Sequence, residues 1–233
     1  MISRSGLAVG FSVLAFGLAM SPTAQAQDLS FDSPYVEFGA GGNWQELALD
    51  NLSSSSNYTP SSTEVSNLEL GADLYAAVGA TLIPGLRAEI QGSYHTNSGA
   101  RFDVQSEGSA TLTADSATFM VLANLWKDFA VTQGMTFSVG AGLGLGSSQQ
   151  TAESGAYTTD INTTGLAYMI GAGVGFDIGS GMVISLTYSL SGIAGGTSGQ
   201  VAFDSSDSDD EPFTGDLSSS MNQSLTVGLR IPM

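Results

Sequence analysis

Few side chains in this chain could carry out acid–base or nucleophilic chemistry. His95 is the only histidine among 233 residues, and cysteine is absent. Without a thiol, neither a cysteine nucleophile nor a thiolate metal site can form. A histidine beside a serine and a carboxylate is the arrangement of a hydrolase. If the chain lies in a membrane, as argued below from its strands, the substrate of such an enzyme would be lipid. Whether His95 can act in this way depends on which face of its strand it occupies.

Other charged residues are spaced so that strands could bring them together near one end of the fold. They are Glu37, Arg87, Glu89, Asp177 and Arg230. Glu37 lies near the start of the first predicted strand, and Arg230 lies near the end of the last. If those strands pair, we predict an ion pair between Glu37 and Arg230, joined by Arg87 and Glu89. Such a cluster is either a structural plug or a gate for ions.

An acidic run, DSSDSDDE at residues 204–211, could bind Ca²⁺ through carboxylate oxygens. It lacks the spacing of an EF-hand loop, so we interpret it as a solvated charged loop, and its binding of cations stays open. The glycine-rich runs at residues 140–146 and 171–177 lie inside predicted strands with no helix after them. They are therefore not dinucleotide-binding loops. We assign no catalytic, cofactor-binding or metal-binding residue.

The charge balance narrows the class of partner. The chain has 22 acidic and 5 basic residues, which gives a formal net charge of −17. Nucleic acid is a poor partner for such a chain, whereas cations or a basic partner fit. Only 12% of the residues are charged, against about a quarter in typical soluble proteins. These charges are too few to coat a soluble surface, which indicates a surface that is not in water.

The first 26 residues have the pattern of a cleavable export signal. Arg4 supplies the positive charge, residues 7–20 are apolar, and AQA at residues 24–26 is a small-x-small cleavage site. We predict that the mature chain starts at Gln27. The alternative is an N-terminal membrane helix, but the apolar run is short for a span of about 20 residues. The predicted organisation is a signal peptide at residues 1–26 and one domain at residues 27–233.

His95 and the charged cluster lie on predicted β-strands. Apolar residues alternate with small or polar ones along much of the chain, which is the period of a β-strand. The pattern is clearest at LAYMIGAGVGFDI and MVISLTYSLSG, which a short glycine-rich joint predicts to be a hairpin. Eight strands are predicted, at residues 35–44, 68–82, 86–96, 117–126, 135–146, 166–178, 182–192 and 221–233. Long polar connections alternate with short ones, as in outer-membrane barrels with short periplasmic turns and longer extracellular loops.

The composition of the two strand faces decides which face meets lipid. A soluble sandwich or barrel would turn the apolar face inward and needs charges on the other face. Here that other face carries mainly Gly, Ser, Thr and Ala, which suit the narrow interior of an eight-stranded barrel. The aromatics of the apolar faces also sort by height, which predicts two interfacial belts. Near the long loops lie Trp44, Tyr94, Tyr168 and Tyr188, and near the turns lie Phe38, Phe129, Phe137 and Phe176. His95 falls on the inward face, away from lipid, which argues against a lipid-active enzyme.

Several stretches resemble the opacity-type small outer-membrane barrels. They are residues 83–98 (IPGLRAEIQGSYHTNS), 117–129 (ATFMVLANLWKDF), 140–146 (GAGLGLG) and 167–178 (AYMIGAGVGFDI). That family includes the Msp2-like surface antigens and is similar in fold to the OmpA membrane domain. The resemblance implies a surface-antigen or adhesin-like role. Its members usually end in an aromatic residue that the outer-membrane assembly machinery reads, whereas this chain ends in Met233.

We therefore predict an all-β fold, an eight-stranded antiparallel up-and-down barrel in the outer membrane of a Gram-negative cell. It is not expected to be an enzyme. The expected role is structural and adhesion-like, with four acidic, serine-rich extracellular loops. Its expected partners are outer-membrane lipids, lipopolysaccharide and the assembly machinery. The alternative is a narrow passive channel for small solutes or ions, and a lipid-modifying enzyme comes after that.

Overall fold

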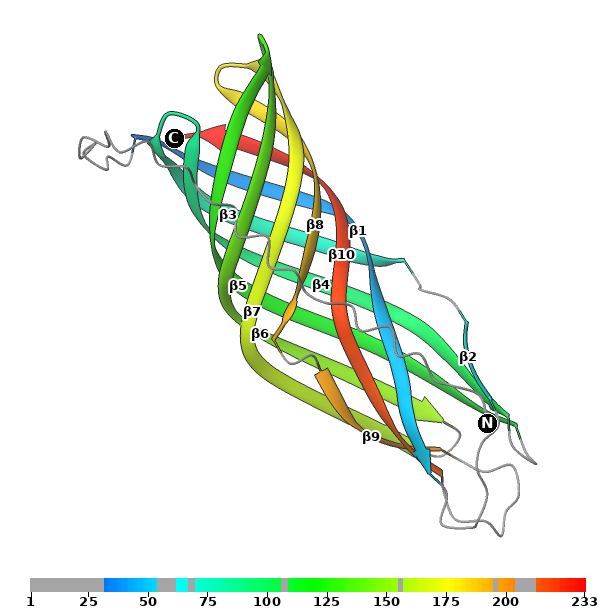
Figure 1. Cartoon of the computed structure of the whole chain (residues 1–233). Helices are drawn as coiled ribbons and strands as arrows, with labels where there is room; N and C mark the ends of the chain where they lie inside the picture. Colours follow the sequence, from blue (N-terminus) through cyan, green and yellow to red (C-terminus); the bar gives the residue numbers. More distant parts are fainter. Residues whose placement is uncertain are drawn as a thin grey trace, which may run out of the picture.

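The strands follow one another around a closed barrel (Figure 1). The computed structural model describes residues 32–53, 62–66, 70–105, 109–154, 157–194, 197–203 and 213–233. The wall strands are β1 (Asp32–Ser53), β3 (Gly71–Ile83), β4 (Leu86–Gln105), β5 (Ser109–Thr132), β6 (Met135–Ser154), β7 (Tyr157–Gly179), β8 (Met182–Ile193) and β10 (Phe213–Pro232). Each pairs antiparallel with its neighbour, and pairing of β1 with β10 closes the ring. The predicted eight-stranded antiparallel barrel is confirmed.

Two short strands add to the wall at the end with the long connections. Strand β2 (Ser62–Ser66) pairs with β4, and β9 (Thr197–Phe203) pairs with β10. Both fall in stretches that we predicted to be loops. Among the described residues, no helix has the length and apolar character needed to cross a membrane.

The wall strands are longer than the apolar pattern predicts. We expected residues 97–116 and 147–162 to be loops, but β4 and β5 pair as far as Gln105 and Ser109, and β6 and β7 as far as Ser154 and Tyr157. An apolar face is required only where the wall meets lipid. Beyond that band, hydrogen bonds between paired strands satisfy the backbone N–H and C=O groups, and no apolar face is needed. The acidic run at residues 204–211 lies outside the described residues.

The short connections all lie at the other end of the barrel, called here the turn end. Gly85, Gly134 and Gly181 have φ angles of 75°, 87° and 73°, which favour glycine because it has no Cβ. The turn that we predicted at residues 127–134 is wrong in extent, because β5 continues to Thr132. Lys127 and Asp128 are therefore part of a wall strand, and Asp128 contacts Arg87.

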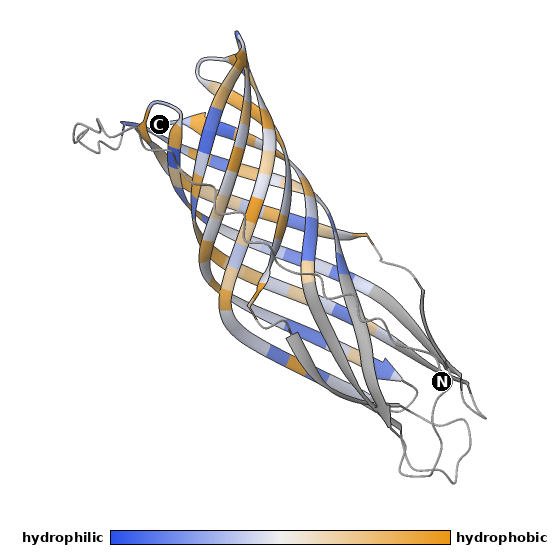
Figure 2. Ribbon diagram, in the orientation of Figure 1, coloured by the Kyte–Doolittle hydropathy of each residue, from blue (hydrophilic) through white to orange (hydrophobic). Residues whose placement is uncertain are grey.

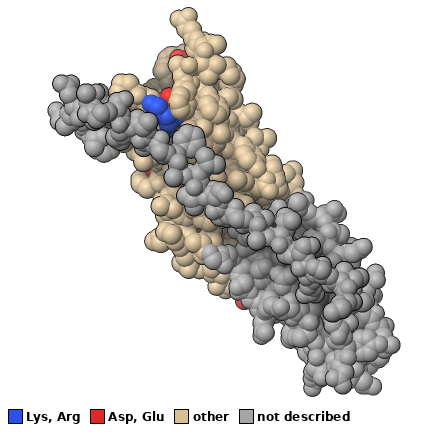
Figure 3. All heavy atoms as spheres, in the orientation of Figure 1, with Lys and Arg blue, Asp and Glu red and all other residues tan. Residues whose placement is uncertain are grey.

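Large apolar side chains point outward from every wall strand, as predicted. Figure 2 shows the alternation of apolar and polar residues along the strands. The outward set includes Phe38, Leu74, Ile90, Leu125, Leu143, Ile170, Leu186 and Val227, which are 42% to 61% exposed. In Figure 3, the described part of the visible surface is almost free of charged atoms. A wall of this kind needs lipid rather than water around it.

The aromatic side chains pair on this outer face at both ends of the apolar band. Trp44 and Tyr188 lie with their ring centroids 6.3 Å apart near the loop end. Phe129 and Phe137 are also 6.3 Å apart, near the turn end. These contacts agree with the two predicted belts, whose amphipathic rings lie mainly on the loop side.

Inside the barrel, β5 carries larger side chains than its neighbour β6. Met120, Leu122 and Trp126 are buried and pack with Ala167 and Met169 of β7. The facing positions of β6 are glycines, and a Cβ added at Gly140 would overlap the ring of Trp126. Glycine is thus required there by the close approach of a neighbouring side chain. This explains why the inward face of residues 117–126 is less polar than the others.

Candidate functional site

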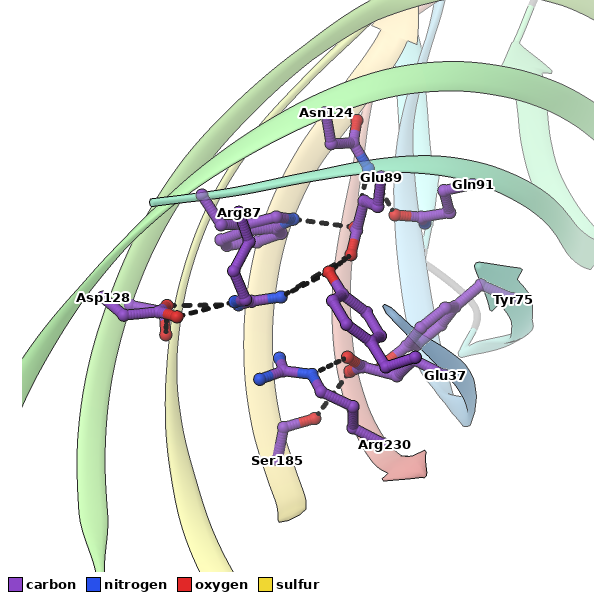
Figure 4. Close-up of polar contacts among 12 residues, drawn as sticks. Glu37, Tyr75, Arg87, Glu89, Gln91, Asn124, Asp128, Ser185 and Arg230 are labelled. Atoms are coloured by element: carbon purple, nitrogen blue, oxygen red, sulfur yellow. Dashed lines mark hydrogen bonds and ion pairs between the residues drawn. The ribbon is translucent and has the colours of Figure 1, made fainter. Parts of the chain in front are cut away.

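A network of charged and aromatic side chains crosses the bore near the turn end (Figure 4). Glu37 of β1 lies directly opposite Arg230 of β10 in the strand register. The Nε of Arg230 donates to Glu37 Oε2 over 2.9 Å. The predicted Glu37–Arg230 ion pair is confirmed. It forms because pairing of the first and last strands brings together residues 193 positions apart in sequence.

The second carboxylate oxygen of Glu37 accepts hydrogen bonds from two further strands. The Tyr75 hydroxyl of β3 and the Ser185 hydroxyl of β8 each donate to Glu37 Oε1 over 3.0 Å. With Arg230, this carboxylate receives donors from three strands besides its own. Glu37 is only 6% exposed, so its negative charge is balanced by these donors rather than by water.

Arg87 of β4 forms the second part of the network. Its Nε and Nη2 donate to the two carboxylate oxygens of Asp128 over 2.6 and 3.2 Å. Its Nη1 donates to the Tyr35 hydroxyl over 2.8 Å. Asp128 also accepts a bond of 2.6 Å from the Ser138 hydroxyl of β6. The two-pronged contact with Asp128 holds the guanidinium plane in one orientation.

Glu89 lies beside Arg87 and is also saturated with donors. Its Oε1 accepts from Trp126 Nε1 at 2.7 Å and from Asn124 Nδ2 at 3.1 Å. Its Oε2 accepts from the Tyr35 hydroxyl at 2.9 Å and lies 3.7 Å from Arg87 Nη1. Trp126 therefore packs its ring against Gly140 of β6 and donates its indole N–H to the network.

Tyr35 joins the two parts. Its hydroxyl bridges Arg87 and Glu89, and its ring lies under the guanidinium of Arg230, with 4.9 Å from Cζ to the centroid. The predicted connection of the Glu37–Arg230 pair to Arg87 and Glu89 thus runs through an aromatic ring. Such a cation–π contact attracts the guanidinium to the face of the ring.

One predicted member does not belong to the network. Asp177 is exposed at the turn end, where its Oδ1 accepts from the backbone N–H of Gly179 at 2.8 Å. A carboxylate that accepts a local backbone N–H two residues on stabilises the turn. Its place on the inward parity was therefore not enough to bring it into the bore.

Sequence reasoning also missed several members. They are Tyr35, Tyr75, Asn124, Trp126, Asp128, Ser138 and Ser185. Tyr35, Tyr75 and Trp126 lie on the inward parity of their strands, and that was a usable signal. Asp128 was lost because we ended its strand at residue 126.

Further from the turn end, the bore contains a second polar region, called here the chamber. Asp73 of β3 and His95 of β4 lie opposite each other, with Asp73 Oδ2 3.3 Å from His95 Nδ1. His95 faces inward, as predicted, and is only 5% exposed. In the described part of the chain, neither of its ring nitrogens has a hydrogen-bond partner. No serine–histidine hydrogen bond, as a hydrolase would use, occurs among the described residues.

The chamber is lined by polar groups that lack partners. Asp73 Oδ1 and the hydroxyls of Ser93 and Ser191 have no hydrogen bond within the described residues. Together with His95 they line a cavity of about 100 Å³ that continues to the network. In the described ranges, no three histidine, cysteine or acidic residues cluster around a common point where a metal ion could bind.

The closed ring, the apolar outer wall and the polar filled bore define a class of protein, the small membrane-spanning β-barrels. Solved structures of outer-membrane barrels share this fold. The outer membrane protein OprG from Pseudomonas aeruginosa matches with a TM-score of 0.52 at 12% identity, covering 88% of this chain and 98% of OprG. At this identity the similarity concerns the fold alone.

Two further solved structures match over most of the chain. Neisserial surface protein A matches at 14% identity with a TM-score of 0.44, covering 86% of this chain and 97% of that one. Ail, the attachment invasion locus protein of Yersinia pestis, matches at 17% identity with a TM-score of 0.41, covering 86% and 99%. No protein-family model matches the sequence. No curated protein matches it either.

Proposed function

We propose that the protein is a closed outer-membrane barrel that anchors acidic loops at the cell surface for adhesion-like contact. The observation that carries this proposal is the network across the bore. Glu37, Arg87, Glu89 and Arg230 each make charge-assisted contacts to more than one strand or aromatic ring. A bore filled in this way serves as a rigid anchor rather than a path for solutes.

The energetics of the network support a closed bore. To open it, the Arg87–Asp128 and Arg230–Glu37 contacts must separate, and each charge must then be rehydrated within a narrow, low-dielectric interior. Separating a buried ion pair leaves both charges without a partner in an interior that solvates them poorly, which is unfavourable. An open state that breaks both contacts at once is therefore rarely populated.

The distribution of charge supports a role for the loop end. The four long connections predicted at residues 45–67, 97–116, 147–162 and 195–217 contain fourteen of the 22 acidic residues but one basic residue, Arg101. Among the described residues of this end, Asp115, Glu153 and Asp160 are exposed. A surface with this charge favours a basic or cation-bridged partner. Lipopolysaccharide phosphates would need such a cation bridge.

Two experiments test the parts of this proposal separately. The refolded chain in a planar bilayer is expected to give flat current traces, and reproducible single-channel steps would instead support the narrow channel. Cells that display the protein are expected to bind polylysine-coated surfaces, and binding should weaken with salt. A variant with the acidic residues of 204–211 changed to Asn or Gln is expected to bind less, and binding equal to the parent would exclude an adhesive role for this run.

No part of the proposal requires an enzymatic step. A lipid-active enzyme needs a nucleophile and a base on the lipid side of the wall. His95 is the only histidine of the chain and faces the bore. Incubation with phospholipid or lipopolysaccharide and mass spectrometry of the lipids is expected to show no product, and acyl loss would contradict this reading.

A further inference from the structure

The chamber contains a carboxylate and an imidazole that face each other without a hydrogen bond. The side chains of Asp73 and His95 are only 4% and 6% exposed. Asp73 Oδ2 and His95 Nδ1 are 3.3 Å apart, yet Nδ1 has no hydrogen-bond partner. A buried carboxylate with one oxygen unpaired is unfavourable unless a cation or another donor satisfies it.

The distance between Asp73 Oδ2 and His95 Nδ1 fits two ligands of one metal ion. Zn²⁺ binds imidazole nitrogen and carboxylate oxygen at about 2.0 to 2.2 Å, so two ligands at tetrahedral angles lie about 3.4 Å apart. The observed 3.3 Å is close to that value. The cavity of about 100 Å³ that Asp73 and His95 help to line, and that continues to the network, has room for an ion and waters.

The charge of the bore points to the same ligand. Four carboxylates face the cavity, those of Glu37, Asp73, Glu89 and Asp128, against the guanidinium groups of Arg87 and Arg230. Arg87 pairs with Asp128 and Glu89, and Arg230 pairs with Glu37, so with His95 neutral, as a metal ligand must be, Asp73 has no cationic partner among these groups. A divalent cation supplies the positive charge that this carboxylate lacks.

We propose that Asp73 and His95 bind one divalent transition-metal ion of the Zn²⁺ class. An imidazole ligand favours such ions over Ca²⁺ or Mg²⁺, which prefer oxygen alone. Waters complete the coordination. The inference stands on the chamber and does not rest on the adhesive role proposed above.

The single histidine makes the test unambiguous. Full-length protein with ¹⁵N-labelled histidine is refolded in micelles, and Zn²⁺ is added while the ring nitrogens are followed by NMR. The Nδ1 signal is expected to shift and to saturate at one Zn²⁺ per barrel, while Ca²⁺ at the same concentrations leaves it in place. Asp73→Asn is expected to weaken binding by about tenfold or more. His95→Gln, measured by calorimetry, is expected to lose this site.

Ser191→Ala is the matched control, because Ser191 lines the same cavity and hydrogen-bonds neither ligand. It is expected to keep the affinity within about twofold, since Ser191 is not one of the two ligands. Each variant is first checked for the folded, heat-modifiable band on a gel. Three results would overturn the proposal: a ring signal unmoved by millimolar Zn²⁺, Zn²⁺ bound elsewhere without that shift, or Asp73→Asn binding like the parent.

Discussion

Two polar regions are buried in the same bore, and they differ in how their hydrogen bonds are satisfied. At the turn end, Glu37 accepts from three side chains and Glu89 accepts from Tyr35, Trp126 and Asn124. In the chamber, Asp73 Oδ1 and both nitrogens of His95 have no hydrogen-bond partner in the described part of the chain. The first region is a set of cross-links, whereas the second leaves room for solvent or an ion.

The difference comes from side-chain length. Asp73 lies four residues before Ala77, the partner of Glu37 in the β1–β3 register, so the chamber is about 13 Å further along the wall at about 3.3 Å per residue. At the turn end, arginine, tyrosine and tryptophan side chains are long enough to reach across the bore. In the chamber, serines such as Ser93 and Ser191 are too short to meet. Long polar side chains therefore cross-link the bore at the turn end, whereas these two serines of the chamber have no hydrogen-bond partner among the described residues.

The largest expected effect follows from removing Arg87. Arg87→Met leaves Glu89 and Asp128 without their shared cation and is expected to lower the free energy of unfolding by about 3 to 5 kcal/mol. Urea unfolding in micelles, followed by tryptophan fluorescence, measures it. Arg87→Lys keeps the charge without the two-pronged contact and should recover part of the loss. An unchanged midpoint for Arg87→Met would show that the cross-links add no stability.

Removing Arg230 is expected to have a smaller effect. Arg230→Gln should cost about 2 kcal/mol, because Glu37 keeps its bonds from Tyr75 and Ser185. The melting temperature, read from the heat-modifiable gel band, is expected to fall below that of the parent. A melting temperature equal to the parent would contradict the stabilising role of this ion pair.

Gly140 of β6 supports the network indirectly, through its contact with Trp126. A Cβ at Gly140 would overlap the Trp126 ring, so Gly140→Ala should displace the donor of Glu89 and cost about 1 to 3 kcal/mol. Gly92→Ala is the matched control, since no atom lies within 4 Å of its added Cβ. Equal urea midpoints for the two variants would contradict the packing described for β5 and β6.

The smallest expected effects concern two serines of β8, Ser185 in the network and Ser191 in the chamber. Ser185 donates to Glu37, so Ser185→Ala is expected to cost about 1 kcal/mol. Ser191 has no partner among the described residues, and Ser191→Ala should change stability by less than about 0.5 kcal/mol. Urea unfolding of the two variants under identical conditions checks the difference. A larger loss for Ser191→Ala would mean that its hydroxyl is satisfied and that the chamber resembles the network.

Much of the wall was predictable because its cause is local. The alternation of Leu225, Val227 and Leu229 with small residues requires a strand with one lipid-facing side. The Glu37–Arg230 pair was also predictable, since closure of any such barrel places the first strand beside the last. Strand ends were not predictable from the apolar pattern, because hydrogen bonding continues beyond the lipid band and no apolar face marks it.

The amino-acid pattern is enough to predict the fold class and the outward face, and it shows that the chain has one histidine and no cysteine. Which inward side chains meet depends on the closed barrel. Tyr35 connects two ion pairs, Asp177 stays at its turn, and Asp73 faces His95. The parity of a strand states which side a residue occupies, but contact across the bore depends on the shear of the barrel and on side-chain length. Those quantities arise from the closed ring rather than from any one strand.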